Sequence, residues 1–320
     1  MTSNRKVLAV PNGGLGNQLF QVAAGLHSSE DNSVCLIKHL GNPRLNSKSM
    51  PVVCDFDTPS VTFSQDFRWR FFRKTSNFLL SFGQNSQKSK SMQLILRLAT
   101  VMMSLLLSLT RIKQIGVQVG IGLGFSSIES RKRTSLLIGY FQTYKFASKP
   151  KVFSQIFDFG PSRIGPDLLA YRDLAIKEKP IMVHVRLGDY LAEKKFGVLP
   201  QSYFLEAIET FAEKNSAIKI WVFSDDLELA RSYFNSEMQA AIRWIPEIDG
   251  SAVNTLELMR HGSGYVISNS TFSWWGAFLS YDRKARVIAP YPWFAHMESP
   301  TDLIPPSWEK INPWGLQSEC

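Results

Sequence analysis

The stretch that most constrains the fold is a short apolar run, Ile181–Val185, in which only His184 is polar. Such a run is typical of a strand buried on both faces of a parallel sheet. Arg186 follows it directly, and Gly188 ends the strand before Asp189. A cation at the carboxyl end of a buried strand is costly unless an anion meets it, and ligands of open α/β sheets bind at that edge. Two interpretations stay open: a structural Arg186–Asp189 ion pair, or a guanidinium that Asp189 orients toward a phosphate.

Strands and helices alternate through the second half of the chain. Apolar strand patterns at 218–223, 265–267 and 286–289 are separated by helical patterns such as 201–214. This alternation predicts an α/β fold with a parallel, doubly wound sheet. The chain has 320 residues, enough for two such domains. Prolines cluster in the segment 148–180, so we predict two domains, 1–160 and 161–320.

The amino-terminal part reads as a strand, a glycine loop and an amphipathic helix between Lys6 and His27. Gly14 and Gly16 lie in the loop, but the third glycine of the dinucleotide-binding fingerprint is missing, so we do not infer NAD. Asn17 and Gln18 are predicted to place two amides at the mouth of the loop. The alternative is that this stretch holds only turn glycines and a helix-capping Asn.

Three strand ends of the second half are predicted to meet at one edge of the sheet. Arg186 follows one strand, Asp225 and Asp226 follow the next, and Ser268–Thr271 open a helix after a third. Free backbone amides at a helix start attract anions. A carboxylate pair can accept hydrogen bonds from guanine or from ribose hydroxyls. The arginine, the carboxylate pair and the helix start together suit a nucleoside diphosphate. The alternative is that these residues form three ordinary helix caps and one ion pair.

Charge and cysteine content narrow the class of protein. The net charge of +9 suits a nucleotide phosphate, an acidic membrane or a nucleic acid, but no nucleic-acid-binding motif is present. Three scattered cysteines (Cys35, Cys54 and Cys320) and a start without the apolar region of a secretion signal favour the cytoplasm. Asp225 and Asp226 are adjacent and lack a neighbouring His cluster, so we expect no metal ion.

The longest apolar stretch, within 92–113, is shorter than a spanning helix needs. We interpret it first as a buried core helix. The second interpretation is a helix lying at a membrane surface, because Arg97, Arg111 and Lys113 flank it. The nearby cluster of cations and aromatic residues at 68–74 is interpreted as a solvated, partly buried helix face, with membrane contact or base stacking as the alternatives.

Three motifs together resemble the signatures of one family, the bacterial α-1,2-fucosyltransferases of glycosyltransferase family 11. They are GGLGNQLFQ (Gly13–Gln21), HVRLGDY (His184–Tyr190) and SNSTFSWWGAFLS (Ser268–Ser280). The resemblance implies the GT-B fold, in which two Rossmann-like domains with parallel sheets face a cleft. It also implies metal-independent transfer of L-fucose from GDP-β-L-fucose, with inversion, to the 2-hydroxyl of a galactose-like residue. O-antigen or surface-polysaccharide synthesis is the expected setting, and no cofactor is expected.

The resemblance also implies roles for individual residues. Arg186 is expected to hold the β-phosphate and stabilise departing GDP, with Leu187 standing where the wider group has a second arginine. The donor-binding residues it predicts are His184, Arg186, Asp225, Asp226, Ser268, Asn269, Ser270, Thr271, Gly14 and Gly16. The catalytic residues it predicts are Arg186, Asp189, Glu193 and Asn17.

The general base and the acceptor are left open. Glu193 is placed much like the base of related enzymes, Asp189 is the other nearby carboxylate, and Asn17 could position the acceptor hydroxyl. The expected partners are GDP-fucose and a galactose-terminated glycan; a lipid-linked acceptor would bring the enzyme to the anionic inner face of the plasma membrane. The alternatives are a sugar-nucleotide-binding protein without turnover and a transferase that uses another GDP-sugar.

Overall fold

The structure is a computed structural model that describes residues 6–46, 49–64, 66–86, 89–108, 115–128, 133–213, 218–300 and 302–315. The chain divides into two compact units. Unit 1 comprises Met1–Ser162 and Pro300–Leu303; unit 2 comprises Arg163–Ser299 and Ile304–Cys320. The boundary falls two residues after the predicted one.

The return of Pro300–Leu303 to unit 1 was not expected from the sequence. Asp302, which is buried, fastens this segment. Its backbone carbonyl accepts hydrogen bonds from Tyr144 N and Thr143 Oγ1, and its carboxylate accepts one from Phe125 N. A single short segment from late in the chain is thereby built into the first unit.

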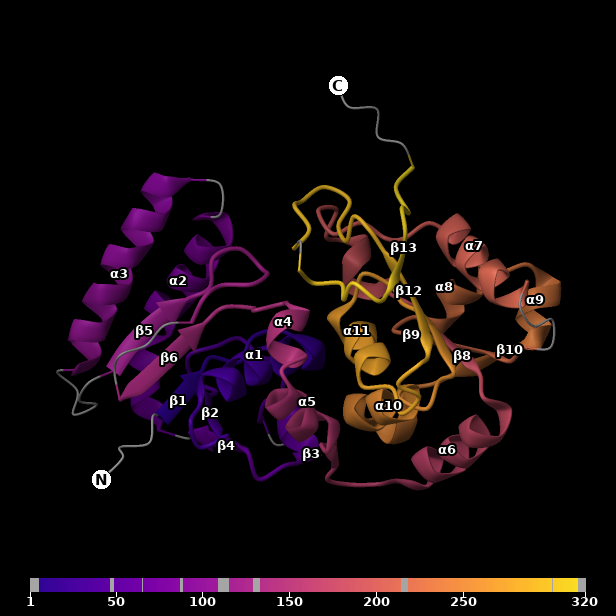
Figure 1. Cartoon of the computed structure of the whole chain (residues 1–320), viewed down its shortest axis with the longest axis horizontal. Coiled ribbons are helices and arrows are strands. Elements are labelled where there is room, and N and C mark those ends of the chain that lie inside the picture. The colour runs from indigo at the N-terminus through magenta and orange to yellow at the C-terminus, as the bar shows by residue number, and fades with distance from the viewer. Residues whose placement is uncertain are drawn as a thin grey trace. The chain divides into compact units, whose positions relative to one another are not determined.

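Unit 1 is built on a five-stranded parallel sheet in the order β4-β2-β1-β6-β5 (Figure 1). Its strands are β1 (Lys6–Ala9), β2 (Val34–Ile37), β4 (Val61–Ser64), β5 (Ile115–Val119) and β6 (Thr134–Ile138). From β1 the chain runs through β2 to β4 at one edge of the sheet. It then continues with β5 and β6 on the other side of β1, so the strand order reverses between β1 and β6. Such a reversal opens a crevice beyond the carboxyl ends of the strands.

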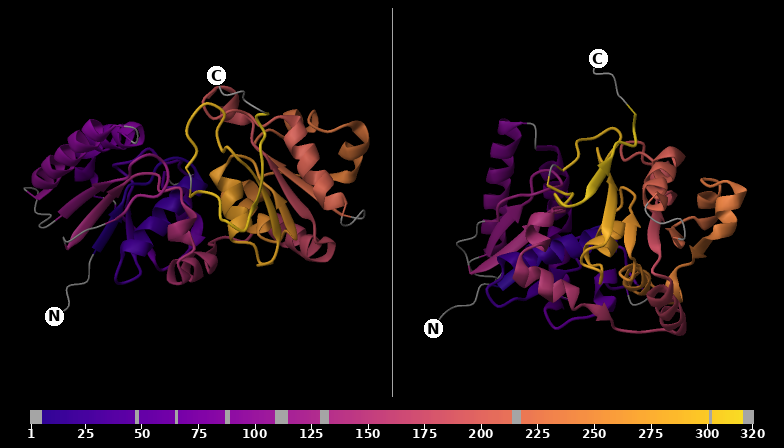
Figure 2. Two further views of the ribbon diagram at one scale, coloured as in Figure 1. Left: turned by 45° about the horizontal axis from the view of Figure 1, so that its top comes forward. Right: turned by 45° about the vertical axis from the view of Figure 1, so that its right-hand side comes forward.

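Helices flank the sheet of unit 1. They are α1 (Leu15–Ser28), η1 (Val52–Asp55), η2 (Phe67–Phe72), α2 (Arg73–Asn85), α3 (Lys90–Ser108), α4 (Tyr144–Ala147) and α5 (Pro150–Phe157), with a small antiparallel pair of β3 (Phe56–Asp57) and β7 (Gly160–Pro161). Helix α1 packs with α4 and α5, whereas α2 and α3 pack on each other and on β5 (Figures 1 and 2). The stretch interpreted as a buried core helix is α3, and that interpretation is wrong, since most of its apolar side chains are exposed.

Unit 2 is built on a six-stranded parallel sheet in the order β10-β9-β8-β11-β12-β13. Its strands are β8 (Ile181–Val185), β9 (Ile220–Ser224), β10 (Ile242–Ile245), β11 (Gly264–Val266), β12 (Arg286–Pro290) and β13 (Glu309–Ile311). Every residue of β8 is buried, as its apolar run predicts. The chain leaves β8 toward β9 and β10 and then returns to β11, so the strand order reverses between β8 and β11.

Helices cover both faces of this second sheet. They are α6 (Pro166–Glu178), η4 (Gly188–Leu191), α7 (Gln201–Ala212), α8 (Leu227–Arg231), α9 (Ser236–Ala241), η5 (Ile248–Gly250), α10 (Ala252–Met259) and α11 (Thr271–Phe278). The aromatic motif lies in α11, where Trp274 and Trp275 are fully buried and pack edge to face. These indoles anchor the helix, so its amino terminus is held at the sheet edge.

The predicted fold class is confirmed: the chain is α/β, with two parallel sheets flanked by helices. The proline-rich segment 148–180 differs from the expected link. It is largely helical, with Pro150 opening α5 and Pro166 opening α6. Proline suits the first position of a helix, where its missing N–H costs nothing and its fixed φ is already helical.

Candidate functional site

The three predicted strand ends of unit 2 lie at one edge of the sheet. Strand β8 is hydrogen-bonded to β9 on one side, with Val185 opposite Ser224, and to β11 on the other, with Val183 opposite Val266. The loops that follow these three strands are therefore neighbours. Because the strand order reverses between β8 and β11, they flank the crevice where doubly wound sheets bind ligands.

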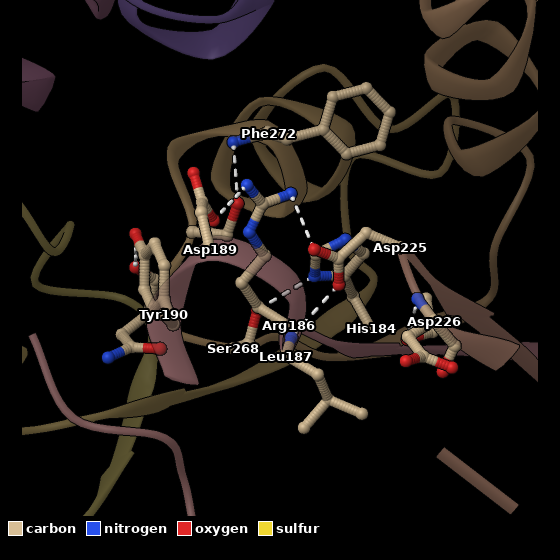
Figure 3. A network of polar contacts seen from close by, with 12 residues as sticks. His184, Arg186, Leu187, Asp189, Tyr190, Asp225, Asp226, Ser268 and Phe272 are labelled. Atoms are coloured by element: carbon tan, nitrogen blue, oxygen red, sulfur yellow. Dashed lines mark hydrogen bonds and ion pairs between the residues drawn. The ribbon is translucent and has the colours of Figure 1, made fainter. Parts of the chain in front are cut away.

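Arg186 emerges from the end of β8 and lies between two carboxylates (Figure 3). Its Nη2 donates to Asp189 Oδ1 at 2.6 Å, and its Nη1 lies 3.3 Å from Asp225 Oδ2. The Arg186 side chain is 14% exposed. Its Nε is buried and has no hydrogen-bond partner among the described residues. The ion pair expected from the sequence is present, and the guanidinium keeps a donor that a bound oxyanion could satisfy.

Asp225 fixes the loop that carries Arg186. Its Oδ1 accepts a hydrogen bond from Leu187 N at 2.9 Å, while Oδ2 faces the guanidinium. A side chain at position 188 would collide with this carboxylate, which explains the glycine. Both Asp225 oxygens thus have partners within the protein, and the predicted hydrogen bonds to guanine would have to displace them. In this structure Asp225 orients Arg186.

Asp226 is the N-terminal cap of α8, the simpler of the two interpretations considered for this pair. Its Oδ1 accepts from Leu229 N at 3.0 Å. Substitution of a helix cap by alanine costs about 1 kcal/mol. A role for Asp226 in guanine binding stays a prediction.

His184 is buried within β8 and joins that strand to the loop after β11. Its Nδ1 lies 2.7 Å from Ser268 Oγ, and its ring packs against Phe272 with centroids 5.7 Å apart. Burial, assisted by the positive charge of Arg186, lowers the pKa of His184 from 6.5 to about 3. The imidazole is therefore neutral near pH 7 and serves as a positioning group rather than as a proton carrier.

The buried neutral His184 makes the stability of the protein pH-dependent. Below pH 6.5 the unfolded chain binds a proton that the folded chain does not, so the free energy of unfolding falls as the pH drops toward 3, by about 1.4 kcal/mol per pH unit. His184→Asn keeps a polar atom for Ser268 but does not titrate. Measured by urea unfolding, the free energy of unfolding of His184→Asn should fall by about 2 kcal/mol less than that of the wild type between pH 7 and pH 5.

Exposed His296 offers the matched control for that measurement. His296→Asn should keep the pH dependence of the wild type. If His184→Asn keeps it too, His184 is not the group responsible.

The loop after β11 directs several of its predicted donor-binding side chains into the protein. Asn269 donates from Nδ2 to the carbonyls of Phe196 and Gly197, at 3.1 and 3.0 Å. Ser270 caps α11, its Oγ accepting from Phe272 N. Thr271 is the first residue of that helix. Ser270 is thus a helix cap, and phosphate contacts of Ser270 and Thr271 stay predictions; the amino terminus of α11 presents backbone N–H groups at this edge.

Tyr190 completes the cluster, a role we did not predict. The Arg186 guanidinium lies 5.4 Å from the centre of its ring, and its hydroxyl donates to Asn269 O at 3.0 Å. Its ring also packs against Phe196. Tyr190 therefore links the loop after β8 to the loop after β11. Its position in the same seven-residue motif as Arg186 was the available signal.

The predicted bases differ in their surroundings. Asp189 is paired with Arg186, with its Oδ1 2.6 Å from Arg186 Nη2. Glu193 is half exposed just after η4, and its Oε2 lies 3.4 Å from Lys195 Nζ. Neither arrangement identifies the base, so Glu193 stays a prediction.

The glycine loop of unit 1 lies at the strand-order reversal of the first sheet. Gly14 is the N-terminal cap of α1, which begins at Leu15, so Gly16 is helical. Asn17 Oδ1 accepts from Gln142 Nε2 at 3.0 Å, and Gln142 follows β6, the strand beside β1. Sequence reasoning missed Gln142, although its place after the apolar run 136–138 was a usable signal. Whether Gly14, Gly16 and Asn17 face a donor stays a prediction.

Gln18 differs from the expectation that it lies at the mouth of this loop. It is fully buried. Its Nε2 donates to Gly13 O and Arg44 O, and its Oε1 accepts from Val53 N. Its amide holds neighbouring loops together instead of meeting a ligand.

Within the described ranges, no group of three or more His, Cys, Asp and Glu side chains is placed to hold a metal ion. Metal independence stays a prediction.

Comparisons with known proteins point to one family. Residues 170–312 match the family described as Glycosyl transferase family 11. Over 189 residues the chain is 30% identical to an alpha-1,2-colitosyltransferase of Escherichia coli, covering 57% of this chain and 64% of that protein. Over 145 residues it is 35% identical to the O-antigen biosynthesis glycosyltransferase WbnK of Escherichia coli, covering 42% and 48%. The resemblance to family 11 is thus confirmed, while the chain spans less than two thirds of either relative.

Among solved structures, the chain is similar to the NodZ alpha-1,6-fucosyltransferase soaked with GDP-fucose. The TM-score is 0.45 at 14% identity, with 86% of this chain and 92% of that chain covered.

Proposed function

We propose that this chain, whose residues 170–312 match the family described as Glycosyl transferase family 11, transfers L-fucose from GDP-β-L-fucose to the 2-hydroxyl of a galactose-like residue. The observation that supports this most is the buried guanidinium of Arg186 at the reversal of strand order in unit 2. That edge combines a fixed cation with the amino terminus of α11. Together they suit the two phosphates of a nucleotide sugar.

The proposed mechanism is a direct displacement. The acceptor hydroxyl attacks the anomeric carbon, its oxygen forms the new glycosidic bond, and the bond to the β-phosphate oxygen breaks with its electron pair leaving on GDP. The hydroxyl proton passes to a base, for which Glu193 is our candidate. Because negative charge grows on the departing phosphate, a preorganised guanidinium lowers the barrier most if it lies at that oxygen.

The two carboxylates beside Arg186 have different parts in this proposal. Asp225 is the fixed partner, because it also accepts a hydrogen bond from Leu187 N. Asp189 is half exposed and holds Arg186 through Oδ1. A phosphate would therefore take the place of Asp189 on Nη2, while Asp225 keeps the guanidinium in position. The acidic neighbours also reduce the net charge of the site before the donor binds.

A second sugar deserves a test because of the relatives. One is named an alpha-1,2-colitosyltransferase, and colitose is fucose without the 3-hydroxyl. A pocket that hydrogen-bonds this hydroxyl would discriminate strongly against colitose, whereas a pocket that leaves it free would accept both sugars. The other relative is named for O-antigen biosynthesis, which favours a surface-polysaccharide acceptor.

The test is release of GDP from GDP-fucose in EDTA, with and without a galactose-terminated acceptor, run in parallel with GDP-colitose. We expect acceptor-stimulated release from at least one donor in EDTA. Tight donor binding without release from any galactose-terminated acceptor would favour a sugar-nucleotide-binding protein without turnover. If neither donor binds, the proposal is overturned and other GDP-sugars become the candidates.

A further inference from the structure

Helix α3 of unit 1 carries an apolar face that no described element covers. Seven side chains form this face, each 49–60% exposed: Leu94, Ile95, Leu98, Val101, Met102, Leu105 and Leu106. At 3.6 residues per turn they occupy the side of the helix opposite Leu96, Met103 and Leu107, which are buried against the unit. A soluble protein seldom exposes such a contiguous face without a binding partner.

The positive charge of the chain is concentrated in the sequence segment that contains this helix. Between Phe67 and Gln114 the sequence has nine Lys and Arg and no Asp or Glu. This equals the net charge of +9 of the whole chain, so the remaining residues are balanced. Two of these cations, Lys90 and Arg97, are exposed residues of α3 itself.

The segment around η2, just before α2, repeats this combination of exposed aromatic and basic residues. Phe67 and Phe71 of η2 are 63% and 78% exposed, and Arg70 and Arg73 are exposed beside them. Helix α2, which follows η2, packs against α3 (Figure 2). Aromatic side chains flanked by cations are typical of segments that insert into the boundary between lipid headgroups and acyl chains.

From this coincidence of apolar face and charge, we propose that α3 and η2 form a membrane-docking surface that lies on an anionic lipid bilayer. The seven apolar side chains of α3 enter the interface, and the Lys and Arg residues meet lipid phosphates. This inference goes beyond the transferase proposal, and its test requires no sugar nucleotide.

Helix α3 is long and apolar enough to cross a membrane by length and composition. Its packing argues against crossing. Leu96, Met103 and Leu107 join a core that includes Ile115 and Val117 of β5, and Ser104 Oγ accepts a hydrogen bond from Val117 N. A spanning α3 would carry the polar backbone of β5 into hydrocarbon, and among the described strands β5 pairs only with β6. If α3 instead lies flat on the membrane surface, the sheet of unit 1 stays in water.

The experiment is flotation of the full chain, without donor or acceptor, with vesicles of phosphatidylcholine alone or mixed with phosphatidylglycerol. The wild type should float with the anionic vesicles and be released by high salt. The double variant Leu98→Gln/Leu105→Gln should bind them about tenfold more weakly or worse, since both side chains are exposed and their loss leaves the core intact. Lys90→Gln/Arg97→Gln should lower binding by at least about fivefold.

The matched control is Leu169→Gln/Ile176→Gln on α6, an equally spaced exposed pair on a helix with three acidic and two basic residues. It should float like the wild type. Three outcomes overturn the proposal. The first is a wild type that does not float, and the second is binding that only detergent reverses and high salt does not, as expected of a spanning helix. The third is a concentration-dependent dimer in sedimentation that Leu98→Gln/Leu105→Gln abolishes while flotation is unchanged. The last outcome would make this face a contact between two copies of the chain.

Discussion

Arg186→Ala is expected to lower the turnover number for sugar transfer by about 10²–10³-fold, the usual cost of removing one preorganised donor from a developing oxyanion. Its guanidinium is mostly buried and is held from two sides by Asp189 and Asp225. No reorganisation is then needed when charge develops on GDP. Leu187 follows Arg186 in the HVRLGDY motif, so the motif offers no other guanidinium to share this charge. The measurement is acceptor-stimulated GDP release at saturating donor.

Two further variants separate this role from a loss of structure. Arg186→Lys keeps the charge but loses the planar fork, so we expect an intermediate turnover. Arg243→Ala removes an arginine that is also ion-paired, to Glu178 at 2.9 Å, but lies near the start of β10, away from the carboxyl ends of the strands. It should retain nearly full activity. Near-normal turnover of Arg186→Ala would remove Arg186 from the mechanism.

The place of the site could be predicted from the sequence, because it depends on backbone topology. The run at Ile181–Val185 identifies a buried parallel strand, and alternating strands and helices bring the carboxyl ends of such strands to one edge. Arg186, Asp225 and Ser268 follow three adjacent strands and therefore meet there. The shared edge follows from a parallel sheet alone, whereas the neighbouring positions of the three loops depend on the strand order β9-β8-β11.

The direction of each side chain could not be predicted in this way. Asp225 is a carboxylate at a strand end, which equally suits a ligand or a nearby N–H; its partner, Leu187 N, lies 38 residues earlier in the chain. Ser268 similarly meets His184, 84 residues away. Residue type fixes what a group can bond, whereas the choice between ligand and protein depends on loops that approach only after folding.

Helix α3 illustrates the same limit for burial. Its sequence is apolar on nearly every side, so periodicity alone does not tell a core helix from one with an exposed face. The neighbours of α3 decide which of its side chains are buried. Helix α3 packs on β5, an edge strand of the sheet, and on α2. Tertiary packing covers one stripe of α3 and leaves the remainder exposed.

Gln21→Leu is expected to lower the free energy of unfolding of unit 1 by about 3 kcal/mol, as removal of one partner leaves buried groups unsatisfied. Gln21 is almost fully buried. Its Oε1 accepts from Asn12 N at 2.9 Å, and its Nε2 donates to Gly139 O at 3.2 Å. It therefore joins the loop after β1 to the loop after β6, across the reversal of strand order. Leucine has a similar size but can satisfy neither backbone group.

Hydrogen exchange of peptides from β1 and β6 measures this loss, because global tryptophan fluorescence would report mainly on unit 2. The matched control is Gln201→Leu, an exposed glutamine at the start of α7, for which a change within about 0.5 kcal/mol is expected. Faster exchange in Gln21→Leu should spread from Asn12 and Gly139 into both strands. If exchange there matches the wild type, the amide of Gln21 is dispensable for the fold, and its hydrogen bonds to Asn12 and Gly139 contribute little to stability.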